Sequence, residues 1–162
     1  MKILGIDPGL RITGYGCIEI HKKNITIIEA GAIKLNIKEN ISFRLEELHR
    51  NITEVICDLT PNIIAIETIF THPKRVTAAT ILGYARGVLL LAGQQASLPL
   101  LELTPATVKK AIAGNGRATK EQMQLAVANI LRLPEPPQPT DVADALAIAI
   151  TAALRNDLKN TM

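Results

Sequence analysis

The amino-acid sequence predicts an α/β fold, with a mixed five-stranded sheet and helices on both faces. Two observations support this fold class. The first third of the chain contains three strand-like segments joined by turns, and the remainder alternates helices with short apolar strands. A length of 162 residues suits one domain. We expect that domain to span residues 1–155, with residues 156–162 forming a frayed end.

The first elements are three strands, predicted at residues 2–7, 13–20 and 24–35. Pro8-Gly9 and the polar segment 21–23 join them, and such short connections favour an antiparallel meander. A helix is predicted over residues 41–59, because its apolar residues recur at alternating steps of four and three.

The remaining elements alternate in type. Residues 63–67, IIAIE, form an unbroken apolar run that ends in an acid, as buried parallel strands do. After it we expect a helix at 76–96, a strand at 98–104, and helices at 105–113, 119–133 and 140–155. The last helix is apolar on nearly every side, so it is expected to be buried.

Composition and charge argue against several classes of protein. The chain is 48% hydrophobic and 20% charged, which is typical of a globular protein. No unbroken apolar run reaches the roughly 18 to 20 residues that span a membrane, and no signal peptide is evident. We therefore expect a cytoplasmic protein without a membrane partner. The formal net charge of +3 permits a polyanionic partner without requiring one. Cys17 and Cys57 lack metal or redox spacing and are expected to be reduced thiols in or near the core.

Four acids lie where the pattern predicts apolar structure, and buried charges are costly unless they are paired or bind metal. Asp7 ends the first strand and Glu67 ends IIAIE, so adjacent strands would bring both acids to one edge of the sheet. Asp141 and Asp144 share one face of the last helix and are expected in its first turn.

Each acid also has an ordinary structural explanation. Asp7 could start a turn, Glu67 could end a strand at the surface, and Asp141 could cap a helix. Asp144 is harder to explain in this way because its neighbours are apolar. Converging carboxylates repel one another, so the four acids together predict bound cations, and oxygen ligands suit Mg²⁺ or Mn²⁺. Two such ions about 3.5 to 4 Å apart commonly hydrolyse phosphodiesters.

Basic residues gather in two stretches: His72, Lys74 and Arg75, and Lys109, Lys110, Arg117 and Lys120. A solvated face is the ordinary explanation of such clusters. Beside a phosphodiesterase site, however, the same residues would bind phosphate groups.

Four segments together closely resemble the RuvC family of Holliday junction resolvases. They are collinear over about residues 1–155 and read GIDPGLRITGYG (5–16), AIETIF (65–70), ARG (85–87) and PTDVADALAIAI (139–150). The resemblance implies a ribonuclease H-like fold and a homodimer. It further implies Mg²⁺-dependent nicking of two opposed strands at a four-way DNA junction in homologous recombination and repair, alongside the RuvA and RuvB branch-migration complex.

By motif position, the resemblance implies that the four acids are the catalytic metal ligands, with two Mg²⁺ ions in each site. It implies that Phe70 is an aromatic wedge that inserts at the junction, although a core Phe at a strand end is an alternative. Lys109 and Lys120 match the family's two functional lysines, and we expect Lys74 and Arg75 also to bind DNA. The loop after Phe70, THPKRVT, departs from the family pattern and leaves the cleavage-sequence preference open.

Two other functions fit parts of the sequence. An actin-like ATP-binding module also opens with a GID strand, but Leu10-Arg11 stand where a phosphate-binding Thr or Ser is expected, and the chain is short for two lobes. A catalytically inactive DNA-binding relative is disfavoured by the four intact acids. We therefore expect a structure-selective endonuclease that dimerises through the apolar helix at 76–96.

Overall fold

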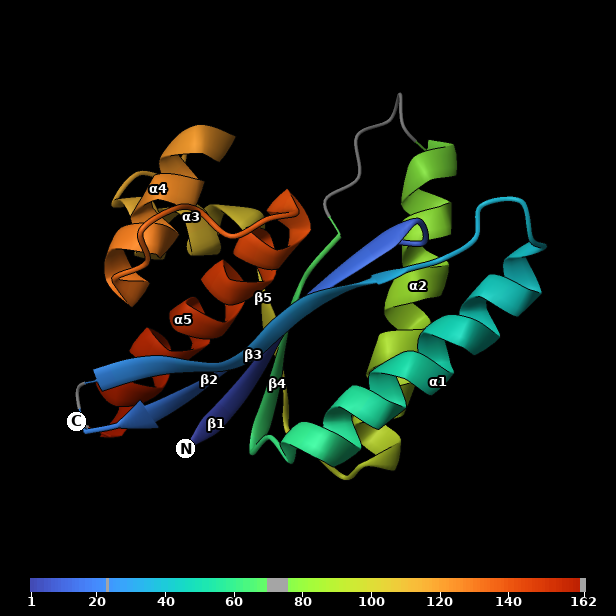
Figure 1. Cartoon of the computed structure of the whole chain (residues 1–162), viewed down its shortest axis with the longest axis horizontal. Helices are drawn as coiled ribbons and strands as arrows, with labels where there is room; N and C mark the ends of the chain where they lie inside the picture. Colours follow the sequence, from blue (N-terminus) through green and yellow to red (C-terminus); the bar gives the residue numbers. More distant parts are fainter. Residues whose placement is uncertain (23, 70–75, 161–162) are drawn as a thin grey trace.

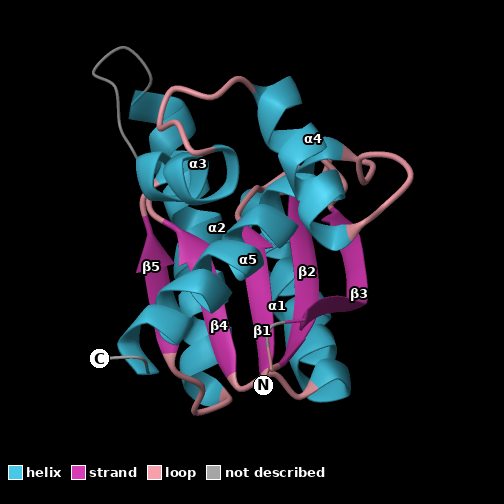
Figure 2. Ribbon diagram, turned by 90° about the vertical axis from the view of Figure 1, so that its left-hand side faces the viewer, coloured by secondary structure: helices cyan, strands magenta, loops and turns pink. Residues whose placement is uncertain are grey.

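The computed structural model describes residues 1–22, 24–69 and 76–160, and within them five strands form one mixed sheet. The strands are β1 (Lys2–Asp7), β2 (Ile12–His21), β3 (Asn24–Lys34), β4 (Ile63–Glu67) and β5 (Leu100–Leu103). Their order across the sheet is β3-β2-β1-β4-β5 (Figure 2). The first three strands form an antiparallel meander, and β1, β4 and β5 run parallel.

In the described part of the chain, five helices cover the two faces of this sheet. They are α1 (Ile41–Leu59), α2 (Val76–Gln95), α3 (Pro105–Ala113), α4 (Lys120–Leu131) and α5 (Thr140–Asn160). Helices α1 and α2 lie on one face, and α3, α4 and α5 lie on the other (Figure 1). Each face has its own apolar core, so alternate residues of the central strands point into different cores.

Most predicted elements agree with the structure, and the differences have local causes. The fifth strand begins at Leu100 instead of residue 98, because Ser97 has a left-handed φ of 55° and the N–H of Leu98 bonds to the carbonyl of Gly93. This left-handed residue and this hydrogen bond end α2 before the strand starts. Helix α5 continues to Asn160, past the predicted end at residue 155, since no Gly or Pro interrupts it.

Both cysteines are free thiols, as predicted, but only one of them is in the core. Cys17 of β2 is fully buried, whereas Cys57 of α1 is exposed. The helical stripe of α1 consists of Leu48, Ile52, Ile56 and Leu59. Cys57 follows Ile56 directly and therefore points away from that stripe.

Helix α2 is more apolar than an ordinary surface helix. Over an 18-residue window its mean hydropathy is 1.5, and only 22% of that window is buried. Length and composition alone would allow it to cross a membrane, which the search for unbroken apolar runs missed because Arg86 interrupts the segment. This is weak evidence for a membrane span. Ala85, Leu89 and Ala92 of the same helix are buried in the core between the helix and the sheet.

Candidate active site

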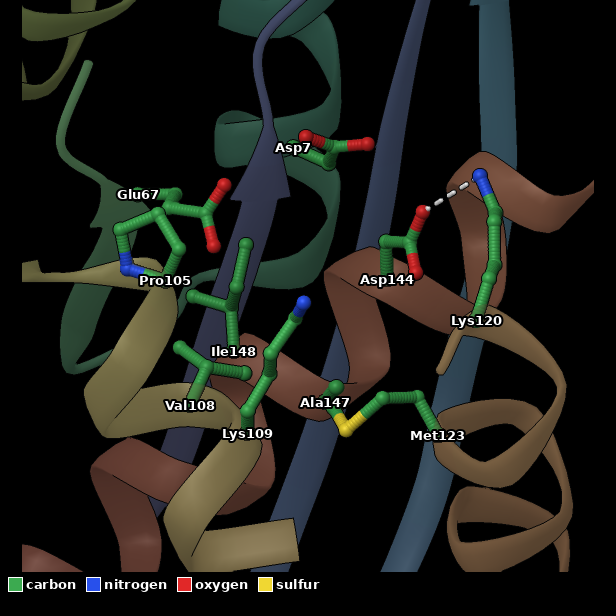
Figure 3. A pocket seen from close by; sticks show the side chains of 10 residues that line it. All are labelled: Asp7, Glu67, Pro105, Val108, Lys109, Lys120, Met123, Asp144, Ala147 and Ile148. Carbon is green, nitrogen blue, oxygen red and sulfur yellow. Dashed lines mark ion pairs between the residues drawn. The ribbon is translucent and has the colours of Figure 1, made fainter. Parts of the chain in front are cut away.

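A cavity of about 240 Å³ opens where β1 and β4 end. Asp7 and Glu67, the last residues of those strands, line it together with Asp144 of α5 (Figure 3). The rest of the lining consists of two cations and an apolar group: Lys109, Lys120, Pro105, Val108, Met123, Ala147 and Ile148. Three of the four predicted acids therefore share one cavity with both predicted functional lysines.

Strand pairing places Asp7 and Glu67 side by side. The parallel register of β1 and β4 aligns Ile6 with Ile66, so the following residues end their strands at the same level. Ile6 and Ile66 are buried in the core beneath α1 and α2. Because side chains alternate along a strand, Asp7 and Glu67 point to the opposite face, where α5 lies. The structure thus confirms the expected arrangement of these two strands.

Two glycines allow α5 to lie close to the sheet. A Cβ atom at Gly5 would be 2.2 Å from the main-chain oxygen of Ala145, and one at Gly14 would be 2.0 Å from that of Asp141. Neither position has room for a side chain, so glycine is required for the close approach of the two backbones. The N-terminal half of α5 is thereby brought to the end of β1, where Asp144 lines the same cavity as Asp7.

The turn that follows Asp7 is fixed by side chains. The hydroxyl of buried Thr13 donates to the main-chain oxygen of Gly9 at 2.5 Å and accepts from the N–H of Gly9 at 3.2 Å. Arg44 of α1 donates to the main-chain oxygen of Leu10. Asp7 therefore precedes a tight turn, as one interpretation expected, and its carboxylate also lines the cavity, while its role as a metal ligand stays a prediction.

The environment of the site disfavours the ionised forms of Asp7 and Glu67. Burial raises the pKa of Asp7 to about 8, and the negative charges of Asp144, Glu67 and Asp141 contribute in that order. Burial also raises the pKa of Glu67 to about 7, with Asp144 adding to the effect and Lys109 opposing it. A group of acids that raise one another's pKa values in this way favours a bound cation.

Lys120 provides a cation at one side of the site. It is the first residue of α4, and the preceding Thr119 caps the helix in a capping box with Gln122. Its ammonium pairs with a carboxylate oxygen of Asp144 at 3.1 Å (Figure 3). Burial lowers the pKa of Lys120, but the hydrogen bond and the charge of Asp144 outweigh this effect, so the net shift is upward.

Asp141 occupies a more peripheral position than the other acids. It lies in the first turn of α5, whereas Asp144 is one turn further along, so the expectation that both would lie in the first turn was wrong for Asp144. Asp141 is not among the residues that line the cavity. Its charge nevertheless raises the pKa values of Asp7 and Lys120, which shows that it belongs to the same electrostatic cluster.

The predicted DNA-contacting segment is outside the part of the chain that the structure describes. Phe70, Lys74 and Arg75 all fall within residues 70–75, so their roles remain predictions.

The apolar residues that line the cavity were not among the site residues predicted from the sequence. Helical spacing could have identified some of them, because Asp144, Ala147 and Ile148 are three and four residues apart on α5.

The ligand atoms available around the cavity are of the type that magnesium prefers. Asp7, Glu67 and Asp144 offer the carboxylate oxygens that Mg²⁺ or Mn²⁺ prefers. Among the described residues, however, no group of three or more His, Cys, Asp or Glu side chains is gathered closely enough to hold a metal ion. Binding would therefore require these side chains to converge, with Asp144 exchanging the ammonium of Lys120 for the metal.

A family model, several similar proteins and two solved structures point to the same family. The model of the family described as "Crossover junction endodeoxyribonuclease RuvC" matches residues 3–152. A protein of that name from Pelotomaculum thermopropionicum is 46% identical over 153 residues, covering 94% of this chain and 93% of its own length. The Thermus thermophilus RuvC structure is 33% identical, with a TM-score of 0.89, and covers 98% of this chain and 97% of its own.

A second structure of T. thermophilus RuvC, in complex with a Holliday junction substrate, gives a TM-score of 0.91 at 33% identity. It covers 98% of this chain and 96% of its own. This likeness and the observed sheet confirm the predicted ribonuclease H-like fold, with a mixed five-stranded sheet and helices on both faces. From the family match over residues 3–152 and the likeness along nearly the whole chain, we conclude that this protein belongs to the RuvC family of crossover junction endodeoxyribonucleases.

Proposed function

We propose that this protein resolves Holliday junctions by Mg²⁺-dependent hydrolysis of two opposed DNA strands. The observation that supports this most strongly is that Asp7, Glu67 and Asp144 line one cavity, in a chain that belongs to a junction-endonuclease family. A relative of the same fold has been solved with a Holliday junction substrate. We further propose a role in homologous recombination and repair, in the cytoplasm, alongside the RuvA and RuvB branch-migration complex.

The proposed reaction adds water across a phosphodiester bond. Oxygen from water attacks phosphorus, and the bond from phosphorus to one ester oxygen breaks. Asp7, Glu67 and Asp144, with Asp141 beside them, would hold two Mg²⁺ ions, which activate the water and stabilise the leaving oxygen when bound. Lys109 lines the cavity and can bind the scissile phosphate. The apolar lining places nonpolar atoms beside these charged groups, and a less polar environment strengthens electrostatic interactions.

Contacts to the rest of the junction are assigned to the segment that follows β4. We propose that Phe70 inserts between bases at the branch point, since unstacking of a base step costs only a few kcal/mol. Lys74 and Arg75 lie in the same short segment and would neutralise nearby phosphates. Lys120 would change its partner from Asp144 to DNA phosphate once metal ions bind the carboxylates.

We also propose a homodimer that forms through α2. Ile81, Tyr84, Val88 and Leu91 follow one another at helical spacing, and Ile81, Tyr84 and Leu91 are each more than a third exposed. At Gly87, beside this row, an added Cβ would meet nothing within 4 Å, so a second helix can approach closely. We call these five residues the α2 stripe. Self-pairing of the stripe would bury it and relate two active sites by a dyad, matching the symmetry of a four-way junction.

A cleavage assay tests the nuclease proposal. The protein is incubated with a synthetic four-way junction, with Mg²⁺ or with EDTA, beside variants Asp7→Asn and Asp58→Asn. Asp58 lies near the end of α1 and away from the cavity, which makes it a matched control. We expect cutting only with Mg²⁺, a loss of about a thousandfold or more for Asp7→Asn, and no loss for Asp58→Asn. Cleavage by Asp7→Asn at the rate of the unmodified protein would refute the mechanism.

A further inference from the structure

We propose that Arg86 is a positioning residue that holds the end of β4, and with it Glu67, in the geometry needed for cleavage. This inference rests on the proposed nuclease function. Arg86 is the middle residue of the ARG segment at 85–87, which supported the family resemblance but has no role in the chemistry described above. It lies on α2, on the face of the sheet opposite the cavity.

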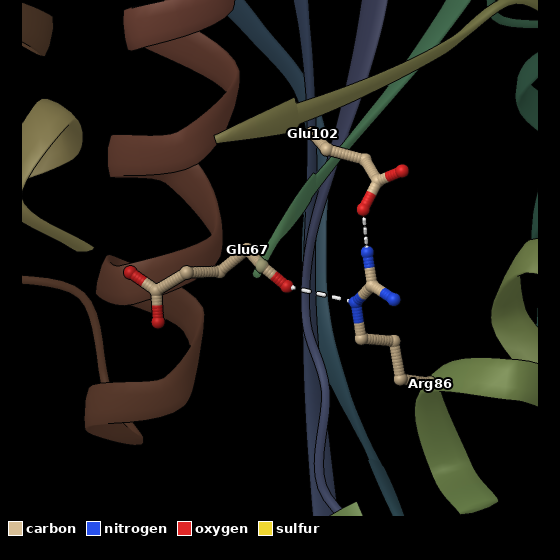
Figure 4. Close-up of polar contacts among 3 residues, drawn as sticks. All are labelled: Glu67, Arg86 and Glu102. Atoms are coloured by element: carbon tan, nitrogen blue, oxygen red, sulfur yellow. Dashed lines mark hydrogen bonds and ion pairs between the residues drawn. The ribbon is translucent and has the colours of Figure 1, made fainter. Parts of the chain in front are cut away.

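The guanidinium of Arg86 bridges two strands. Its Nε–H donates to the main-chain oxygen of Glu67 at 3.2 Å, and its Nη2 pairs with the carboxylate of Glu102 on β5 (Figure 4). The side chain of Glu67 points the other way, toward α5 (Figure 4). Arg86 therefore acts on the backbone of Glu67 and does not enter the cavity.

The Glu67 carbonyl is at a position where β4 is paired with β5 but no longer with β1. On the β1 side, the pairing with β4 ends at Ile6 and Ile66, one residue earlier. On the β5 side, Glu67 is aligned with Leu103, and the N–H of Thr68 donates to the Leu103 oxygen at 2.8 Å. The strand end is thus held on one side by β5, and Arg86 adds a hydrogen bond at the carbonyl of Glu67 itself.

The chemistry of arginine suits this bridge better than that of lysine. The Arg86 side chain is only 16% exposed, whereas that of Glu102 is 52% exposed, so the carboxylate pairs with a largely buried cation. The planar guanidinium has several donors in fixed directions and can bind a carbonyl and a carboxylate at the same time. A lysine ammonium in the same place would keep the charge but could not reproduce both contacts in this geometry.

A small displacement of Glu67 would be enough to affect catalysis. A shift of about 1 Å in a reacting group can cost roughly a hundredfold in rate. Loss of the Arg86 bridge would free the Glu67 carbonyl and loosen the strand end that carries the carboxylate. We therefore expect substitution of Arg86 to slow cleavage and raise the Mg²⁺ requirement, with little effect on binding of the junction.

The experiment compares Arg86→Met, Arg86→Lys and Glu102→Gln with Arg50→Met, a control at an exposed arginine of α1. Single-turnover cleavage is measured at saturating junction over a range of Mg²⁺ concentrations, junction affinity is measured in EDTA, and folding is checked by thermal unfolding. For Arg86→Met we expect a rate about 10 to 100 times lower and a Mg²⁺ requirement raised about threefold or more, with affinity unchanged. Arg86→Lys and Glu102→Gln should show smaller losses of the same kind.

Hydrogen–deuterium exchange gives a second readout that does not depend on cleavage. Exchange of the backbone amides at residues 63–69 should be about tenfold faster in Arg86→Met than in the unmodified protein, and unchanged in Arg50→Met. This result would support the bridge even if the unmodified protein cut no junction, which would count against the proposed function alone.

Two results would overturn the inference. One is a folded Arg86→Met protein with unchanged cleavage rate, Mg²⁺ requirement and amide exchange. If Arg86→Met does not fold, Arg86→Lys decides the question, because it keeps the positive charge but cannot make both contacts. Unchanged cleavage and exchange in that variant would likewise exclude a positioning role.

Discussion

Asp7 lies in an environment that disfavours its own charge. Its pKa of about 8 in the metal-free protein results first from burial and then from Asp144, Glu67 and Asp141. An aspartate in an unfolded chain ionises near pH 4. Between these values the folded protein holds a proton that the unfolded chain has released, so folding stability contributed by Asp7 is complete below about pH 4 and is lost as pH rises through about 8.

This difference predicts the pH dependence of stability without metal. From pH 5 to pH 8 in EDTA, the free energy of unfolding should fall more steeply for the unmodified protein than for Asp7→Asn, by roughly 1 to 3 kcal/mol. Urea unfolding at the two pH values measures the difference, with Asp58→Asn as the control for a surface carboxylate. Equal pH dependence in the unmodified protein and Asp7→Asn would show that Asp7 ionises normally.

Phe70 gives a second test at a single residue. If it inserts between bases at the branch point, Phe70→Ala should slow junction cleavage about tenfold or more, because unstacking is no longer compensated. Phe43 of α1 is the matched control, since it is 58% exposed and lies away from the cavity. Junction cleavage is measured for both variants under the same conditions. An unchanged cleavage rate for Phe70→Ala would refute the proposed insertion of Phe70 between bases.

Some residues of the site could be identified from the sequence, and others could not. Asp7 and Glu67 were identifiable because each ends an apolar strand, and strand pairing alone brings them together. The apolar lining formed by Val108 and Met123 could not be identified from the sequence, because it depends on how α3 and α4 pack near the end of the sheet. The contact of Arg86 with a carbonyl on another element also depends on tertiary packing and leaves no pattern in the sequence.

At the level of elements, the position of α5 depends on the glycines beneath it. Gly14→Ala would place a methyl group 2.0 Å from the Asp141 oxygen, so α5 must move away from β2. We expect a loss of about 1 to 3 kcal/mol in stability and about tenfold or more in cleavage rate. Chemical denaturation and the junction assay measure these effects.

Gly116→Ala is the control for this substitution, because its added Cβ would be 3.7 Å from the Ala106 oxygen, an ordinary contact. Unchanged stability and activity in Gly14→Ala would show that α5 can shift without cost, and that the close approach is not required for the site.

The subunit interface proposed on α2 can be tested by substitution of one residue. A charge in the α2 stripe, as in Leu91→Glu, should convert the dimer to a monomer at about 10 µM protein, because association would bury two like charges near the dyad. Leu125→Glu on α4 is a matched control: Leu125 is 57% exposed and Leu91 is 51% exposed. Light scattering after size-exclusion chromatography gives the masses. A dimer in Leu91→Glu would place the interface elsewhere.

Elements were predicted well where a local signal fixes their ends. Helices α1 and α3 have the predicted bounds, since apolar periodicity marks α1 and Thr104-Pro105 begins α3. Bounds were less accurate where distant contacts or neutral residues decide them. The start of β5 depends on the turn at Ser97, and the end of α5 lies in a polar segment without a stop signal.

In the whole molecule, the proposed dimer would combine two active sites related by a dyad. The cavity acids and the α2 stripe lie on opposite faces of the sheet, so dimerisation through α2 would leave both cavities open to DNA (Figure 1). Two sites related by a dyad can cut two strands related by the symmetry of the junction. The central claim is therefore that a single protein dimer makes paired cuts and that each cut depends on the carboxylates around the cavity.

The most direct measurement of this claim uses a supercoiled plasmid that extrudes a cruciform, because the product reports how many strands were cut in one binding event. Paired cuts across the cruciform give linear DNA, whereas a single cut releases the supercoil and gives a nicked circle. We predict that the unmodified protein with Mg²⁺ gives mainly linear DNA, and that Asp7→Asn or added EDTA leaves the plasmid supercoiled. Nicked circles as the lasting product, or linear DNA from Asp7→Asn, would contradict the account.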